Sequence, residues 1–464
     1  GLDSAATLSL TKLAHPHATS IGLGTGALAN DDGTINSNTA VGQNALNTLT
    51  TGSSNAAFGA NALCANNGNN NSAFGFGALK QNTSGQYGHA FGRYALYTNS
   101  TGGYNIAMGH QAMCSNTTGC MNLAIGHKAL QCNTCAHENT VIGYGSTRSN
   151  TVGCQNTALG SKTLYSNTSG SYNIAIGFCS LYANTIAASN IAVGAQTLKA
   201  NTTGAGNVVV GTYALCNTTT GSYNTVIGHQ AMGTSVTSNC NVAVGWLAGY
   251  QACGYDNVFI GRSSGRKNTN VRWATTVGAN AACCVASGCQ YISIGQAHQC
   301  STEVNRSVAI GYAAAWKNTH NQSVAIGHYS NSCGGSSQTA VGYYGLSSNT
   351  CYGNVAIGNH ALRNNTTGKY NIAVGYGSMC GIGSTGACNV YMGHRPGMRN
   401  TTACLNIGIG METLCAATVG GCNVAMGRLS LRSLTSGMCN TAIGEQAGLN
   451  LTTGCGNLLL GRSA

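Results

Sequence analysis

The sequence predicts an all-β fold, a parallel β-solenoid of about 27 coils, and two observations lead to it. First, a glycine that ends segments such as Asn-Ile-Ala-Val-Gly recurs 27 times between Gly22 and Gly461, at a mean spacing of 439/26, about 17 residues. Second, the 464 residues include 67 glycines but only 28 charged residues and two prolines. A unit this short cannot bury an apolar face alone, so the units are expected to stack. Helical repeats are longer and need a period of about 3.6, which is absent here.

Each coil is expected to contain two short strands and two turns. Counting from the repeated glycine, position −1 is apolar in every unit and position −2 is alanine in seventeen of 27. Because side chains alternate along a strand, positions −3 and −1 share one face and −2 looks the opposite way. A second apolar segment follows, with Leu or Met frequent at +4. The coil then closes through Asn-Thr-Thr-Gly or a relative, whose Asn and Gly favour left-handed backbone conformations.

Asparagine stands at position −4 in twenty of the 27 units, including Asn105, Asn122 and Asn173. Stacked in register, identical amides can bond to one another along the column. The pattern therefore predicts an asparagine ladder, although a carbohydrate-binding row of amides is an alternative.

Composition excludes several classes of protein. The net charge is +12, but most basic residues stand alone, so nucleic-acid binding is not expected. No cofactor is expected either, because the glycine-rich strings belong to the repeat and do not indicate a phosphate-binding loop. No apolar run approaches the roughly 20 residues of a spanning helix, and no membrane insertion or leader segment is expected. Twenty-three cysteines favour an extracellular location.

Many cysteines flank the Asn-Thr-Thr-Gly loop, and a disulfide within a coil would cross-link the two ends of this turn. Pairing between coils or chains, and unpaired buried thiols, are alternatives. The candidate pairs are Cys114 with Cys120, Cys132 with Cys135, Cys380 with Cys388, and Cys415 with Cys422.

Two further kinds of site follow from short motifs. His15-Pro16-His17 is a weak metal candidate, because three chains would bring six imidazoles together. Sequons arise from the turn consensus, and glycosylation would depend on a eukaryotic secretory pathway. The candidates for glycosylation are Asn82, Asn99, Asn116, Asn167, Asn201, Asn365 and Asn400.

The chain is expected to divide into an N-terminal cap or junction (1–20), regular repeats (21–245), a divergent segment (246–338) and further regular repeats (339–464). In the divergent segment the Asn at −4 and the Leu or Met at +4 both lapse, the latter with Gln299 among the replacements. Either the coil changes cross-section there and tryptophan fills the core, or the segment binds a receptor. The receptor-binding candidates are Trp246, Arg262, Arg266, Lys267, Arg272, Trp273 and Trp316.

The segments Asn305–Gly311 (NRSVAIG) and Gln322–Gly327 (QSVAIG) resemble the head repeat of trimeric autotransporter adhesins. The longer form with Asn-Thr-Thr-Gly turns resembles repeat regions of phage and giant-virus tail fibres. The resemblance covers residues 19–464. It implies a left-handed parallel β-roll, side-by-side association of three chains, and attachment to a host surface. The small residues at −2 fit a close approach of three backbones.

The sequence therefore predicts an extracellular structural fibre, a viral or phage tail or capsid fibre, with the head of a bacterial trimeric adhesin as the alternative. Its expected partners are two further copies of itself, a host surface receptor such as a glycan, and other fibre or virion components. No enzymatic activity is expected. A tailspike-like glycan-degrading enzyme would need two carboxylates close together, and an ice-binding solenoid would need a flat threonine array.

Overall fold

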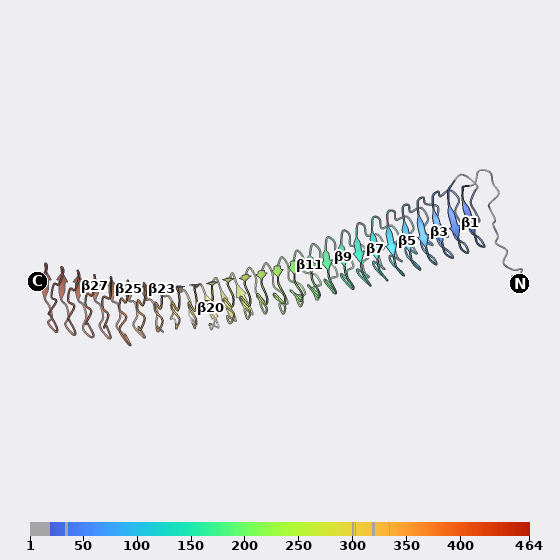
Figure 1. The fold of residues 1–464 in the computed structure, drawn as a ribbon. Coiled ribbons are helices and arrows are strands. Elements are labelled where there is room, and N and C mark those ends of the chain that lie inside the picture. Colours follow the sequence, from blue (N-terminus) through green and yellow to red (C-terminus); the bar gives the residue numbers. More distant parts are fainter. Residues whose placement is uncertain (1–18, 33–35, 299–300, 302, 318–320, 334) are drawn as a thin grey trace, which may run out of the picture. The chain divides into compact units, whose positions relative to one another are not determined.

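The computed structural model describes residues 19–32, 36–298, 301, 303–317, 321–333 and 335–464. These residues form strands and turns, and none of them is in a helix. The chain forms two compact units, Gly1–Asn239 and Cys240–Ala464. In each unit every coil contributes a three-residue strand that lies parallel to the strand of the next coil (Figure 1). The predicted parallel β-solenoid is confirmed.

The first unit has thirteen strands in its described residues, paired in parallel and in chain order. They are β1 (Ile21–Leu23), β2 (Thr39–Val41), β3 (Ala56–Phe58), β4 (Ser72–Phe74), β5 (His89–Phe91), β6 (Ile106–Met108), β7 (Leu123–Ile125), β8 (Thr140–Ile142), β9 (Thr157–Leu159), β10 (Ile174–Ile176), β11 (Ile191–Val193), β12 (Val208–Val210) and β13 (Thr225–Ile227).

The second unit has a main parallel sheet and a second sheet of three strands, counted over its described residues. The main sheet contains β14 (Val242–Val244), β15 (Val258–Ile260), β17 (Thr275–Val277), β19 (Ile292–Ile294), β21 (Val308–Ile310), β22 (Val324–Ile326), β23 (Thr339–Val341), β24 (Val355–Ile357), β25 (Ile372–Val374), β26 (Val390–Met392), β27 (Ile407–Ile409), β28 (Val424–Met426), β29 (Thr441–Ile443) and β30 (Leu458–Leu460). The second sheet contains β16 (Asn270–Arg272), β18 (Ser287–Cys289) and β20 (Glu303–Asn305).

The strands alternate as predicted, but the small residue at −2 faces the interior of its own coil. In β6, Ala107 is fully buried, whereas Ile106 and Met108 are exposed by 37% and 42%. The same pattern recurs along both units. The expectation that the −2 alanines let three backbones approach is therefore wrong, because these side chains fill the narrow core of one chain. The apolar residues at −3 and −1 form the outer face.

The second apolar segment of each coil is a run of turns and not the predicted second strand. Gln111 and Met113 both have positive φ, at 57° and 50°, so the backbone between them is not extended. Hydrogen bonds nevertheless run between coils, for example from Met113 N to Ala129 O at 3.0 Å. The leucine or methionine at +4 points inward and is buried, as Met113 is. Periodicity located this segment correctly but did not reveal its conformation.

The repeated glycine is required by close contact between coils. Gly109 has a φ of 133°, and a Cβ on it would lie 2.6 Å from the Gly126 carbonyl oxygen of the next coil. The first coil departs from the predicted register, since Ile21 pairs with Thr39 and Gly24 stands beside Gly42. Gly24, and not Gly22, is thus the repeated glycine of that coil, because only Gly24 has the positive φ, at 125°.

The predicted asparagine ladder at −4 is confirmed. Asn122 Nδ2 donates to Asn105 Oδ1 at 3.2 Å, and Asn139 Nδ2 donates to Asn122 Oδ1 at 3.0 Å. Each of these side chains also donates to a corner carbonyl of the next coil, such as that of Ala136. The ladder therefore satisfies backbone oxygens that would otherwise be buried without a partner.

A second asparagine ladder, which the sequence did not reveal, runs at position +7. Asn116 Nδ2 donates to Asn99 Oδ1 at 2.6 Å and to Gly119 O at 3.0 Å. These asparagines open the Asn-Thr-Thr-Gly turn, and we expected them to serve only the turn conformation. They are buried, and the polar column they form is part of the core.

The second sheet occurs where the −4 ladder lapses. Ala274 and Tyr291 replace asparagine there. The corner segments of neighbouring coils instead pair with one another as the parallel strands β16, β18 and β20. Val271 and Val304 from this sheet pack against Tyr291 in a small apolar cluster. The Tyr291 hydroxyl contacts the Asn268 amide at 2.7 Å, and burial raises the pKa of Tyr291. In these three coils, strand pairing thus takes the place of the amide bonds.

Candidate functional site: a polar and aromatic strip

The second sheet ends on one exposed corner of the second unit. Arg272, Cys289 and Asn305 are the last residues of β16, β18 and β20. With the residues that follow them, they form a continuous row over neighbouring coils, held in register by bonds such as Gln290 N to Arg272 O at 3.0 Å. We call this row the corner strip. It comprises Tyr255, Arg272, Trp273, Cys289, Gln290, Asn305, Arg306, Asn321 and Gln322.

The N-terminal half of the corner strip is aromatic and cationic. The Arg272 guanidinium lies 4.9 Å from the centre of the Tyr255 ring, and the Trp273 ring meets Tyr255 edge to face at 5.7 Å. Trp273 is 49% exposed. An exposed indole beside a guanidinium can stack on a sugar and hydrogen-bond its hydroxyls.

The C-terminal half of the corner strip is a polar groove of about 450 Å³. Its lining residues are Cys289, Asn305, Arg306, Asn321, Gln322 and Ser336. Asn305 Nδ2 donates to Asn321 Oδ1 at 3.1 Å, and Asn305 Oδ1 accepts from Cys289 N at 2.9 Å. Amide and guanidinium groups on successive coils offer donors and acceptors at the spacing of the coils.

The structure separates the predicted receptor-binding residues into different corners. Arg272 and Trp273 belong to the corner strip. Trp246 and Arg262 lie at +1 on successive coils, where Ser263 N donates to Trp246 O. Arg266, Lys267 and Trp316 lie at +5 or +6. The basic cluster seen in the sequence is therefore not one surface.

Tryptophan does not fill the core of the divergent segment, because Trp246 and Trp273 are 50% and 49% exposed. The core position +4 is instead occupied by small or polar residues. His298 takes this place, and not Gln299 as counted from the sequence, since His298 N donates to Ala314 O at 3.0 Å. Gln299 lies outside the described residues.

The groove residues Asn305, Arg306, Asn321 and Gln322 were missed as a site by sequence reasoning. A sequence pattern for this site was present, since Asn305 and Arg306 stand at −6 and −5 of one unit and Asn321 and Gln322 at −6 and −5 of the next. Asn and Gln are so frequent in this chain that their alignment across coils was indistinguishable from the repeat itself.

No cysteine in the described residues is joined in a disulfide, so the predicted bonds within a coil are absent from the structure. The two members of a predicted pair have different neighbours. The Cys114 thiol lies beside Ser115, whereas the Cys120 thiol lies beside the Thr118 carbonyl and the Gly103 amide. In the other three predicted pairs, burial raises the pKa of one member, namely Cys132, Cys380 and Cys415, which disfavours the reactive thiolate.

The seven candidate sequon asparagines all stand in the buried +7 column, each at most 1% exposed. Asn167 Nδ2, for example, donates to Asn150 Oδ1 and to Gly170 O. A glycan on this nitrogen would replace one of its two hydrogens and so remove at least one of these bonds, and it could not fit inside the coil. The geometry does not support glycosylation of the folded chain.

The weak metal candidates His15 and His17 lie outside the described residues. Within those residues, no group of three or more His, Cys, Asp and Glu side chains is placed to hold a metal ion. Two carboxylates of the second unit, Glu412 and Glu445, are engaged by arginines on separate coils, whereas Asp31 and Asp32 of the first unit lie together and both accept from Asn36 Nδ2. Glu412 pairs with Arg432 at 3.0 Å, and Glu445 accepts from Arg428 Nε at 3.0 Å.

The threonines of the turn are aligned along the coils, but their hydroxyls are used internally. Thr117 Oγ1 donates to Thr134 O at 2.9 Å, and Thr134 Oγ1 donates to Thr151 O at 3.0 Å. A hydroxyl that serves the neighbouring backbone does not form the open array that ice binding needs.

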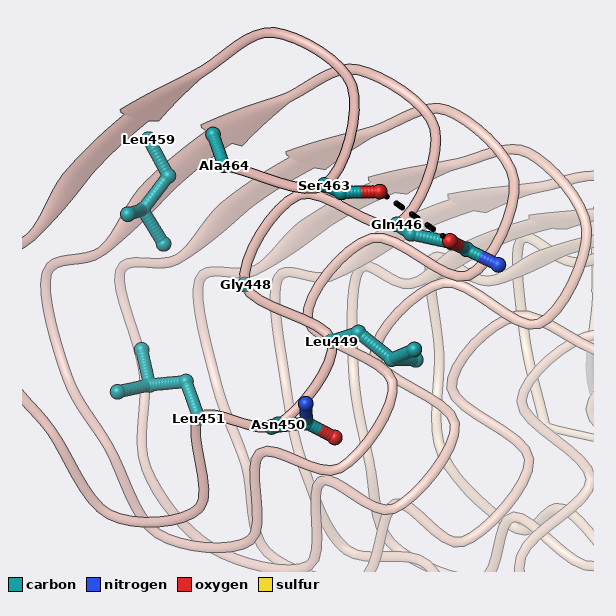
Figure 2. Close-up of a pocket in the computed structure, with 8 residues that line it drawn as sticks. All are labelled: Gln446, Gly448, Leu449, Asn450, Leu451, Leu459, Ser463 and Ala464. Carbon is teal, nitrogen blue, oxygen red and sulfur yellow. Dashed lines mark hydrogen bonds between the residues drawn. The ribbon is translucent and has the colours of Figure 1, made fainter.

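A second pocket, of about 450 Å³, lies at the last coil (Figure 2). Figure 2 shows Ser463 pointing toward Gln446, and the Ser463 hydroxyl donates to Gln446 Oε1 at 3.3 Å. Leu449, Leu451 and Leu459 supply apolar lining. None of the lining side chains is titratable.

Comparison with known proteins does not assign the chain. The described residues contain no helix with the length and apolar character of a membrane span. No family model matches the sequence, and no curated protein is similar to it.

Proposed function

We propose that this chain is a structural fibre protein that works outside the cell, associates side by side with copies of itself, and attaches to a carbohydrate surface. A viral or phage tail or capsid fibre is the preferred assignment, and the head of a bacterial trimeric adhesin is the alternative. The single observation that supports the proposal most is the outer face of the strands, which is apolar in coil after coil.

The outer face favours self-association. Phe58, Phe74 and Phe91 stand at −1 on successive coils, each 37% exposed, with ring centres 4.8 and 4.9 Å apart. A long exposed apolar stripe is typical of a protein interface. A second copy has the same coil spacing, so identical chains can cover each other's stripes without losing register. Three copies, as in the proteins this repeat resembles, are proposed.

Self-association can be tested by sedimentation velocity on the F58S/F74S/F91S variant. We expect this variant to shift toward the monomer, because serine removes the stacked aromatic part of the apolar face while the buried −2 alanines remain. The matched control is Y87S/Y104S, which removes a stacked aromatic pair at −5, on a different corner. If the phenylalanine variant assembles like the wild type, the stacked phenylalanines are not part of the interface.

Attachment is assigned to the corner strip, whose aromatic half and amide groove are complementary to the apolar faces and hydroxyls of sugars. The test is binding of the assembled fibre to a glycan array. We expect R306A/Q322A to lose binding, whereas R262A/R266A/K267A, on other corners, should keep it. Loss only in the second variant would move the receptor site to those corners, and release of sugar from the array would favour the enzymatic alternative.

A further inference from the structure

Two adjacent thiols lie in contact at one corner of the second unit. Cys283 and Cys284 have their sulfur atoms 3.5 Å apart, and both residues are partly exposed. They form the only Cys-Cys dipeptide in the sequence. The two sulfurs are therefore next to each other on residues that are partly exposed.

The backbone holds this pair in place from both sides. Ala282 and Val285 flank it and are fully buried. Cys283 N donates to Asn280 O, and Val285 N donates to Ala282 O, each at 3.3 Å. With both ends anchored in the core, the two side chains keep their mutual position without a ligand, which reduces the entropy lost on binding.

The contact is a property of this corner, because other coils repeat it with different residues. At the equivalent positions +5 and +6, Cys114 Sγ lies 3.8 Å from Ser115 Oγ. Cys216 Sγ likewise lies 3.8 Å from Asn217 Oδ1. The corner thus brings the tips of two consecutive side chains together, and in one coil both tips are thiols.

Direct oxidation of this pair is disfavoured by chain geometry. The Cα atoms of adjacent residues are about 3.8 Å apart across a trans peptide. Disulfides usually join Cα atoms about 4.4–6.8 Å apart, and departures from that range strain the bond. An atom that bridges the two sulfurs avoids this strain, because the sulfurs need not approach to bonding distance.

We propose that Cys283 and Cys284 form a dithiol site that chelates one thiophilic trivalent metalloid centre of the arsenical class. Such a centre is pyramidal and takes two adjacent sulfurs at close to their contact distance. With an organic arsenic(III) oxide, two As–S bonds form and the As=O bond breaks. The two thiol protons leave with the oxygen as water. Arsenic stays trivalent, so no oxidant or reductant is needed.

The probe for this site is phenylarsine oxide, used on the full chain and followed by excess glutathione, which removes adducts held by one thiol. Intact mass spectrometry should show a glutathione-resistant adduct that dithiothreitol releases. We expect C283S, C284S and the double variant each to lose one resistant adduct per chain. The control C64S/C216S changes two cysteines at the same corner position that lack a cysteine neighbour, and should lose none.

A transplant tests whether the corner itself creates the site. In the C283S/C284S background, S115C places a thiol beside Cys114 and should restore one resistant adduct. Far-UV circular dichroism checks that every variant keeps the wild-type fold. The proposal is overturned if the wild type gives no resistant adduct, if C283S/C284S binds as much as the wild type, or if folded S115C gains nothing.

Discussion

The His298 side chain makes the second unit sensitive to acid. It is fully buried, and neither ring nitrogen has a hydrogen-bond partner among the described residues. Its ring meets Tyr291 edge to face at 5.8 Å. Burial lowers the pKa of His298 to about 3. In the unfolded chain the same group titrates near its ordinary value, roughly 6.5.

The sign of the effect follows from this depression of the pKa. Between roughly pH 6.5 and 3, the unfolded state binds a proton that the folded state does not, so stability falls as pH falls. The stability is fully present above about pH 6.5. Each pH unit costs about 1.4 kcal/mol, so lowering the pH from about 6.5 to 4.5 costs on the order of 2–3 kcal/mol. The chain has only eight carboxylates, but burial also lowers the pKa of His360 in the same unit, which adds to the dependence, so the effect of His298 has to be measured locally.

His298→Leu should remove the dependence. Leucine is the residue that other coils, such as that of Leu346, place at this core position. The variant should also be more stable at neutral pH by about 1–3 kcal/mol, because no buried polar atoms are left unpaired. Since a long repeat need not unfold in one step, the assay is hydrogen exchange of amides in β19 and β21, corrected for intrinsic rates, between pH 7 and 4.5.

The control is His328→Leu, because His328 is exposed and should leave the pH dependence unchanged. If H298L loses local stability with falling pH as steeply as the wild type does, the buried imidazole is not the acid-sensitive group.

Two further predictions concern the regular coils, both measured by thermal unfolding followed by circular dichroism. Asn133→Ala should destabilise the first unit by about 1–3 kcal/mol for each partner left unpaired, because Asn133 Nδ2 donates to Asn116 Oδ1 at 2.6 Å. The control is Asn359→Ala, which changes an exposed asparagine. Equal losses of stability in the two variants would show that the ladder does not stabilise the fold. Gly109→Ala should cost more than about 3 kcal/mol from the clash with Gly126 O and the strained φ. Gly383→Ala, whose added Cβ meets nothing within 4 Å, should cost about 1–2 kcal/mol from φ alone. Similar losses in both glycine variants would show that coil contact is not what requires glycine.

The repeat was enough to predict the fold and the first ladder. A spacing of about 17 residues and the alternation around Ala107 leave few arrangements other than stacked coils, because each unit is too small to fold alone. The recurrence of Asn at −4 predicted the hydrogen bonds of the ladder, because identical residues in stacked coils lie next to one another. These conclusions depend only on period and residue type.

Tertiary structure decided which way each face looks and which residues meet across coils. Alternation showed that Ala107 opposes Ile106 and Met108, but the direction of the core depends on how the coil closes through the left-handed residues Gln111 and Met113. The corner strip and the contact between Cys283 and Cys284 likewise depend on corner geometry, which brings together side chains that a count along the sequence treats as ordinary turn residues. Such contacts depend on the backbone conformation of the corner, and the period and composition of the repeat do not reveal that conformation.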